Sequence, residues 1–202
     1  TIIRSPYLGG ISLWVFLLSL AGTFAYYLQA EVISNANLDS ASCTQIFGAI
    51  DLAANILIPL IQLLITGFLL KRAGIGPTLA VVAAIAVIGF LALAAMPTLA
   101  VVIAVQIAYR AGSFALSNPA REALWPVVDR EQKYKTKNVV DNVVFRGGDV
   151  ANSWIYNALS ASAGLGTAAI ALVGATVSAG WIVVSVVLGR AQAAKTRSQT
   201  PV

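Results

Sequence analysis

The sequence predicts an all-α membrane protein in which six transmembrane helices form two three-helix repeats. Hydrophobic residues make up 58% of the 202 residues and charged residues only 10%, and the mean hydropathy is +0.83. A soluble domain carries about 25% charged residues, so this composition suits a surface that mostly faces lipid. Several apolar windows also reach the length of about 20 residues that a helix needs to cross a bilayer.

The apolar windows and the charged segments between them define the predicted topology. The six spans are expected at residues 7–30, 46–70, 77–96, 98–118, 138–159 and 166–189. Every second connection is basic: Arg4 precedes the first span, Lys71 and Arg72 follow the second, a loop at 119–137 follows the fourth, and a tail at 190–202 follows the sixth. Basic segments stay on the cytoplasmic side of a membrane, so both termini and the loop 119–137 are predicted to be cytoplasmic.

Polar side chains divide the six spans into two kinds. The first, second, fourth and fifth spans each carry a polar stripe, whereas the third and sixth are almost uniformly apolar. The order polar, polar, apolar therefore occurs twice, as in transporters that are built from repeated three-helix units. We expect the two apolar spans at the periphery and the other four to turn their polar faces inward, because ionised groups are costly in hydrocarbon.

The fifth span is the richest in polar residues, which repeat along one face of the expected helix. The candidates for binding a substrate are Asn138, Asp141, Asn142, Arg146 and Asp149 on this span, together with Arg110 on the fourth. Arg146 and Asp149 are spaced to pair on one helix face, either as a gated pair or anion contact in a cavity or as a structural pair between helices. Arg110 has three readings: a substrate contact, a partner of Asp141 or Asp149, or a side chain that snorkels to the cytoplasmic face.

Acidic residues on other spans are candidates for coupling or gating. Asp51 lies early in the second span, and Glu31 follows two tyrosines at the outer end of the first. For Asp51, proton binding stands beside a structural role near the outer mouth of the bundle. Glu31 has the same two readings, because an intramembrane carboxylate is either functional or held by a polar partner.

Several kinds of site are excluded by composition. The chain has no histidine and a single cysteine, Cys43, which rules out His-based chemistry, an internal disulfide and a cysteine-cluster metal site. No nucleophile–base pair or Walker loop occurs, so we expect neither an enzyme nor a cofactor. The net charge of +5 lies in short segments between apolar spans, which argues against a nucleic-acid partner. Lys133, Lys135 and Lys137 are interpreted as an anchor for anionic membrane lipid.

Residues 67–74, with the sequence GFLLKRAG, resemble the signature loop G-x-L-x-D-R-x-G of the major facilitator superfamily. The segment lies between the second and third expected helices, which is its place in a six-helix half of those carriers. Lys71 stands where the superfamily usually has Asp. The resemblance implies one half of a major-facilitator-type carrier, and it adds Lys71 and Arg72 to the candidates for coupling or gating.

Residues 118–149 resemble the bacterial branch of the ATP/ADP translocase family. In that family a basic K-x-K-x-K segment leads into a helix with a V-D-x-V pattern, and these motifs match residues 133–137 and 140–143 here. The resemblance implies the C-terminal half of a twelve-helix carrier in a bacterial inner membrane. It also implies, as partners, a missing N-terminal six-helix half or another membrane subunit, and a nucleotide or other anionic small molecule.

Three functions remain open at this point. The first is half of a carrier that exchanges an organic anion or nucleotide by alternating access, with Arg110 and Arg146 as its cationic groups. The second is a proton-coupled major-facilitator carrier for another small solute, driven through Asp51, Asp141 or Asp149. The third is a membrane scaffold or accessory subunit that does not transport.

Overall fold

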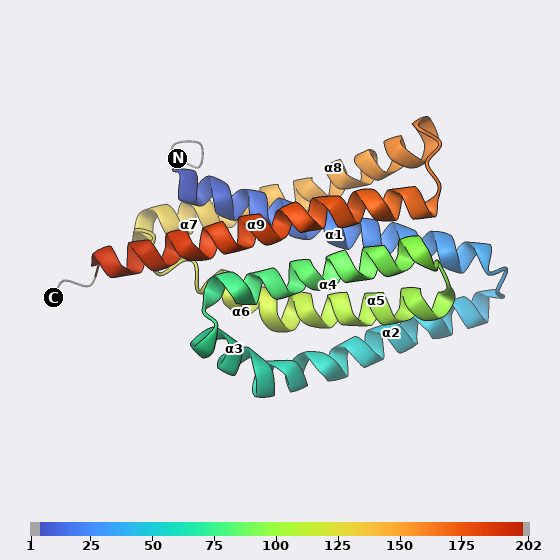
Figure 1. Ribbon diagram of the computed structural model, residues 1–202, viewed down its shortest axis with the longest axis horizontal. Helices are drawn as coiled ribbons and strands as arrows, with labels where there is room; N and C mark the ends of the chain where they lie inside the picture. Colours follow the sequence, from blue (N-terminus) through green and yellow to red (C-terminus); the bar gives the residue numbers. More distant parts are fainter. Residues whose placement is uncertain (1–4, 200–202) are drawn as a thin grey trace.

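The computed structural model describes residues 5–199 as a bundle of helices, with no strand among them (Figure 1). The α-helices are α1 (Pro6–Asn35), α2 (Ser40–Ile61), α3 (Gly67–Arg72), α4 (Ile75–Ala95), α5 (Leu99–Gly112), α6 (Asn118–Glu122), α7 (Arg130–Asn138), α8 (Phe145–Asn157) and α9 (Thr167–Gln199). Four π-helical segments join or extend them: Gln62–Thr66, Ser113–Ser117, Val139–Val144 and Ala158–Ser162. The prediction of an all-α protein is confirmed. Arg4 lies outside the described residues, as do residues 200–202 of the predicted tail.

Five helices within residues 5–199 are long and apolar enough to cross a membrane, which indicates an integral membrane protein. They are Pro6–Asn35, Ser40–Arg72, Ile75–Ala95, Leu99–Glu122 and Thr167–Ser198. The sequence predicted six such spans, and the expected fifth, at 138–159, is not among them. It lies in a helical run from Arg130 to Ser162 whose middle carries ionised side chains, so length and apolarity alone do not mark it as a membrane span.

The predicted loop at 119–137 is mostly helical, which corrects the sequence prediction. Pro119 lies inside α6, which continues from α5 through the segment Ser113–Ser117. Proline breaks a helix by removing one ladder hydrogen bond and crowding an earlier carbonyl, and a π-helical segment has already altered that ladder. The non-helical connection is therefore only the stretch between Glu122 and Arg130, and the predicted tail is helical as far as Gln199.

Helix α1 is the centre of the bundle and contacts α5, α8 and α9. Its buried side chains include Trp14, which packs on Trp181 of α9 with a ring-centroid distance of 5.5 Å. The Trp14 Nε1 also donates a hydrogen bond of 2.9 Å to the Ser185 hydroxyl. The indole nitrogen is thus paired away from water, as a buried tryptophan requires.

Helices α4 and α9 pack along each other (Figure 1). They cross at Gly76 and Gly189, where a Cβ atom added to Gly76 would lie 3.1 Å from the Gly189 Cα. The absence of both side chains lets the two backbones approach closely. This pair of helices forms the side of the bundle away from α2.

Helix α2 lies at the opposite edge and packs mainly on α5. Within Ser40–Ile61 only Ile50 and Ala54 are buried. The sequence predicted an inward polar face for this span, but most of the helix is exposed in this chain. One α2 side chain, Asp51, nevertheless contacts a residue of the site, as described next.

Candidate functional site

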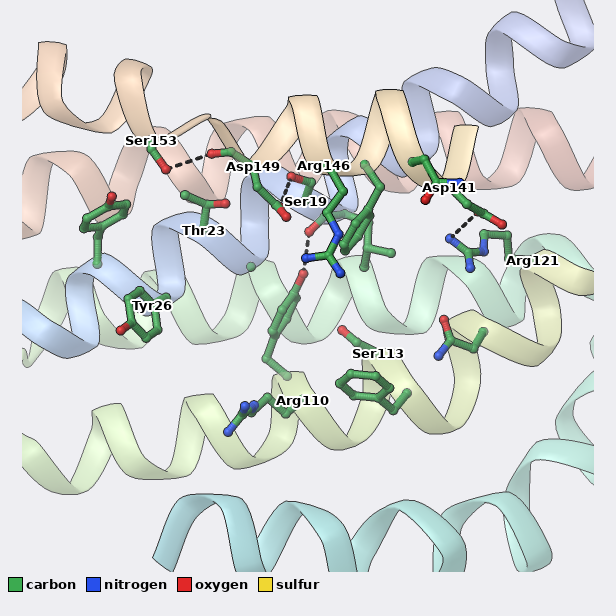
Figure 2. A pocket seen from close by; sticks show the side chains of 18 residues that line it. Ser19, Thr23, Tyr26, Arg110, Ser113, Arg121, Asp141, Arg146, Asp149 and Ser153 are labelled. Carbon is green, nitrogen blue, oxygen red and sulfur yellow. Dashed lines mark hydrogen bonds and ion pairs between the residues drawn. The ribbon is translucent and has the colours of Figure 1, made fainter. Parts of the chain in front are cut away.

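A cavity of about 740 Å³ lies between α1, α5 and the helical run Arg130–Ser162, which includes α7 and α8 and is called the polar run (Figure 2). Its lining residues are Leu18, Ser19, Gly22, Thr23, Tyr26, Tyr27, Tyr109, Arg110, Ser113, Phe114, Asn118, Arg121, Asp141, Asn142, Phe145, Arg146, Asp149 and Ser153. Apart from Arg121, which lies in the predicted loop 119–137, these residues belong to three of the four spans that were predicted to carry inward polar faces. The two apolar spans, α4 and α9, contribute none of them. They were predicted at the periphery, but both carry fully buried side chains, such as Leu79 of α4 and Trp181 of α9, and α2 is the more exposed helix.

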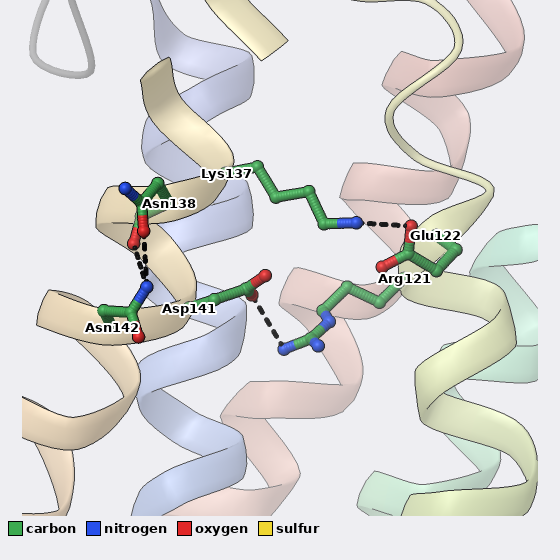
Figure 3. A network of polar contacts seen from close by, with 6 residues as sticks. All are labelled: Arg121, Glu122, Lys137, Asn138, Asp141 and Asn142. Carbon is green, nitrogen blue, oxygen red and sulfur yellow. Dashed lines mark hydrogen bonds and ion pairs between the residues drawn. The ribbon is translucent and has the colours of Figure 1, made fainter. Parts of the chain in front are cut away.

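The lining contains three arginines and two aspartates, and one of the arginines was not among the sequence candidates. Arg121 forms an ion pair with Asp141, with 3.3 Å between the Arg121 Nη1 and the Asp141 Oδ1 (Figure 3). The Arg121 side chain is only 16% exposed, and its buried Nε has no hydrogen-bond partner in residues 5–199. Part of its donor capacity is therefore still open, because a guanidinium offers five N–H groups.

Asp149 is held by α1 rather than by Arg146. The Ser19 hydroxyl donates a 2.6 Å hydrogen bond to Asp149 Oδ1, and the Asn152 side-chain amide donates to the same hydroxyl at 3.2 Å. Gly148 makes this approach possible, because a Cβ atom there would lie 3.1 Å from the Ser19 Oγ. The expected Arg146–Asp149 pair does not form, since no ion pair between them occurs in the described chain.

Arg146 points into the cavity with an exposed side chain (Figure 2). Among residues 5–199 it makes neither an ion pair nor a side-chain hydrogen bond. Its neighbours Asp141 and Asp149 are engaged by Arg121 and Ser19. Arg146 is therefore the one lining charge that has no partner within the described residues.

Arg110 pairs with Asp51 of α2. The sequence reading that paired it with Asp141 or Asp149 is wrong, because Asp141 pairs with Arg121 and Asp149 accepts a hydrogen bond from Ser19. Asp51 is not itself a lining residue. Both side chains of the pair stay about half exposed, at 46% for Arg110 and 55% for Asp51.

The two asparagine candidates contact each other at the α7 end of the polar run (Figure 3). The Asn142 amide donates to the backbone carbonyl of Asn138 at 3.1 Å. Asn142 lines the cavity and Asn138 does not. Nearby, Lys137 pairs with Glu122 at 2.7 Å, and this ion pair joins α7 to α6.

The remaining coupling and gating candidates lie away from the cavity. Glu31 accepts a 2.8 Å hydrogen bond from the Tyr156 hydroxyl and another from the Thr167 hydroxyl, and so joins α1, α8 and α9. Lys71 and Arg72 end α3 with exposed side chains. The Arg72 guanidinium lies over the Phe68 ring of its own helix, 4.9 Å from the centroid.

Sequence reasoning missed Arg121 as a site residue and the contact of Tyr109 with α1. Arg121 follows Arg110 by eleven residues (121 − 110), or about three helical turns, so it shares a face with Arg110 once the helix is allowed to continue through Pro119. The Tyr109 hydroxyl donates to the Leu18 carbonyl at 2.8 Å and fixes α5 against α1. No spacing rule within one helix could have identified that contact.

The assembled site is an open cavity with a cationic group available, aromatic side chains on its wall and several hydroxyl groups. No cluster of three metal-binding side chains occurs in the described residues. Comparison with known proteins gave no match to a family model, to a curated protein or to a solved structure. The geometry of the chain is therefore the sole support for a function.

Proposed function

We propose that this chain is one six-helix half of a membrane carrier that moves an organic anion by alternating access. The observation that carries the proposal is the unpaired Arg146 inside a cavity of about 740 Å³. That volume falls in the range of small-molecule sites, roughly 300–1,000 Å³. A cation without a counter-ion in such a place favours an anionic ligand, because its N–H donors are free to form charge-assisted hydrogen bonds.

The polar run through α7 and α8 supports the same reading. It packs against α1, yet its middle carries Asp141, Arg146 and Asp149 on the side that faces the cavity (Figure 2). Val150 and Trp154 are exposed on the same helix. A helix that is apolar on one side and ionised on the other is expected of a sixth membrane span that lines a solute pathway.

The proposal includes a second helical bundle that covers the open side of the cavity. Alternating access needs two units that rock around a central site, and the nucleotide-exchanger and major-facilitator resemblances imply such a partner. With the basic segments on the cytoplasmic side, both termini face the cytoplasm, and we place the carrier in a bacterial inner membrane. A nucleotide is one member of the anion class to be tested.

The test is uptake into proteoliposomes of a labelled panel of organic anions, nucleotides included. We expect Arg146→Gln to fold and to lose about tenfold or more of its apparent affinity, which is the loss expected for one charge-assisted contact. Arg190→Gln is the matched control, because Arg190 is exposed on α9 and lies outside the cavity. Equal uptake by the two well-folded variants would refute anion binding at Arg146.

A further inference from the structure

The Asp51–Arg110 ion pair joins α2 and α5 at a point far from the residue at which each helix begins. Asp51 lies eleven residues beyond the start of α2 (51 − 40), and Arg110 lies eleven beyond the start of α5 (110 − 99). A rise of 1.5 Å per residue places both about 16 Å from those helix ends, near the middle of a hydrocarbon core of about 30 Å. Because both side chains are about half exposed, the pair must face water or protein rather than lipid.

The two residues of this ion pair differ in their position relative to the cavity. Arg110 lines the cavity and Asp51 does not, so the carboxylate reaches an arginine of the binding site from outside it. The arrangement differs from that of Arg121, whose partner Asp141 is itself a lining residue and whose side chain is largely buried. Half-exposed ion pairs typically change an equilibrium constant by no more than about fivefold. An anion inside the cavity can therefore compete with Asp51 for Arg110.

We propose that Asp51 is an internal stand-in for one anionic group of the substrate. On this proposal, which rests on the proposed function, the substrate carries two separated negative charges. One charge binds the unpaired Arg146, and the other displaces Asp51 from Arg110. The cavity thereby distinguishes a two-charge anion from a one-charge anion, because a single charge is satisfied by Arg146 and leaves the Asp51–Arg110 pair intact.

Displacement of Asp51 also affects how α2 is held. Among the described residues, few polar contacts attach α2 and its extension to α5: the Asp51 pair, a 3.2 Å hydrogen bond from the Gln62 amide to the Phe114 carbonyl, and one from the Thr66 hydroxyl to the Ala115 carbonyl. The last two lie on the far side of Pro59, toward α3. Loss of the Asp51 contact leaves the other end of α2 held by apolar packing around Ile50 and Ala54, so occupancy of the cavity is linked to how firmly this helix is held.

Binding of dicarboxylates to the purified protein tests the proposal, with the series from succinate to azelate as two-charge probes and acetate as the one-charge probe. We expect Asp51→Asn to tighten binding of the best-fitting dicarboxylate by up to about fivefold and to leave acetate binding unchanged. We expect Arg110→Gln to weaken dicarboxylate binding, and the double variant to bind as Arg110→Gln does. Thermal unfolding shows which variants are folded.

Movement of α2 gives a second measurement. Cys43, the only cysteine of the chain, lies in the first turn of α2, and an environment-sensitive fluorophore attached there reports on that end of the helix. We expect the dicarboxylate to change its emission in the unsubstituted protein and not in Arg110→Gln.

Two results separate the failure of this inference from the failure of the proposed function. If Arg146→Gln weakens anion binding while Asp51→Asn leaves dicarboxylate binding unchanged or weaker, Asp51 is not a competitor, and the anion carrier remains. The inference about Asp51 also fails, and the anion carrier remains, if a one-charge anion binds at Arg146 and no dicarboxylate binds. If neither arginine affects binding of any anion, both proposals fall.

Discussion

The close crossing of α4 and α9 gives a sharp test of the fold. Gly189 lies against the backbone of Gly76, so a Cβ atom added to Gly189 would meet the Cα and N atoms of Gly76 rather than a flexible side chain. Substitution of Gly189 by Ala therefore cannot be accommodated by a change of rotamer. The two helices have to move apart along an interface that includes the buried Phe90 of α4, whose ring lies against Gly174 of α9.

The expected cost follows from that geometry. Inserting a methyl group into a well-packed site costs about 1–3 kcal/mol when neighbours must shift, and separation of two backbones also loosens the dispersion contacts beside them. We expect Gly189→Ala to lower the free energy of unfolding by about 2–3 kcal/mol, measured by denaturant titration in detergent. Gly180→Ala on the same helix is the control, because its Cβ would meet nothing within 4 Å.

The free energy of unfolding of the control variant is expected to stay the same or to rise. Alanine is favoured over glycine in a helix by up to about 1 kcal/mol, so Gly180→Ala should be neutral or slightly stabilising. If Gly189→Ala proves as stable as Gly180→Ala, the helices do not cross where the structure places them, and the packing of α9 on α4 has been misassigned.

Three further outcomes are expected. Ser19→Ala removes the donor to Asp149 and should lower the free energy of unfolding by about 2 kcal/mol, as a denaturant titration would show; an unchanged midpoint would mean that another group already satisfies the carboxylate. Tyr156→Phe removes one of the two hydroxyl donors to Glu31 and should cost about 1–2 kcal/mol without altering anion affinity, whereas a loss of affinity would place Glu31 in the transport pathway. Cys43 should react with a membrane-impermeant maleimide from the outside of intact cells, and reaction from the cytoplasmic side alone would reverse the predicted topology.

The helical architecture was largely predictable because hydropathy and helical periodicity are local properties. The polar face of the fifth expected span was readable in the same way, and Asp141, Arg146 and Asp149 all line the cavity. Charge partners were not predictable, because they depend on which helices become neighbours. Arg110 pairs across to α2, and Asp149 is held by α1, whereas spacing along one helix can suggest only partners on that helix.

The interrupted helical ladders of α2 and α5 lead to the last prediction. Thr66 is 5% exposed, and its hydroxyl donates a 2.9 Å hydrogen bond to the Ala115 carbonyl, which lies in the π-helical segment Ser113–Ser117. Replacing Thr66 by Val keeps the shape and removes the donor, and an unpaired buried carbonyl costs about 1–3 kcal/mol. Thr176→Val on α9 is the control, because the Thr176 hydroxyl is exposed and bonds only to its own helix at the Leu172 carbonyl. We expect Thr66→Val alone to lower the free energy of unfolding in detergent. Equal stability of the two variants would show that the hydroxyl does not join α2 to α5, and that α2 is held by its apolar contacts and the Asp51 pair alone.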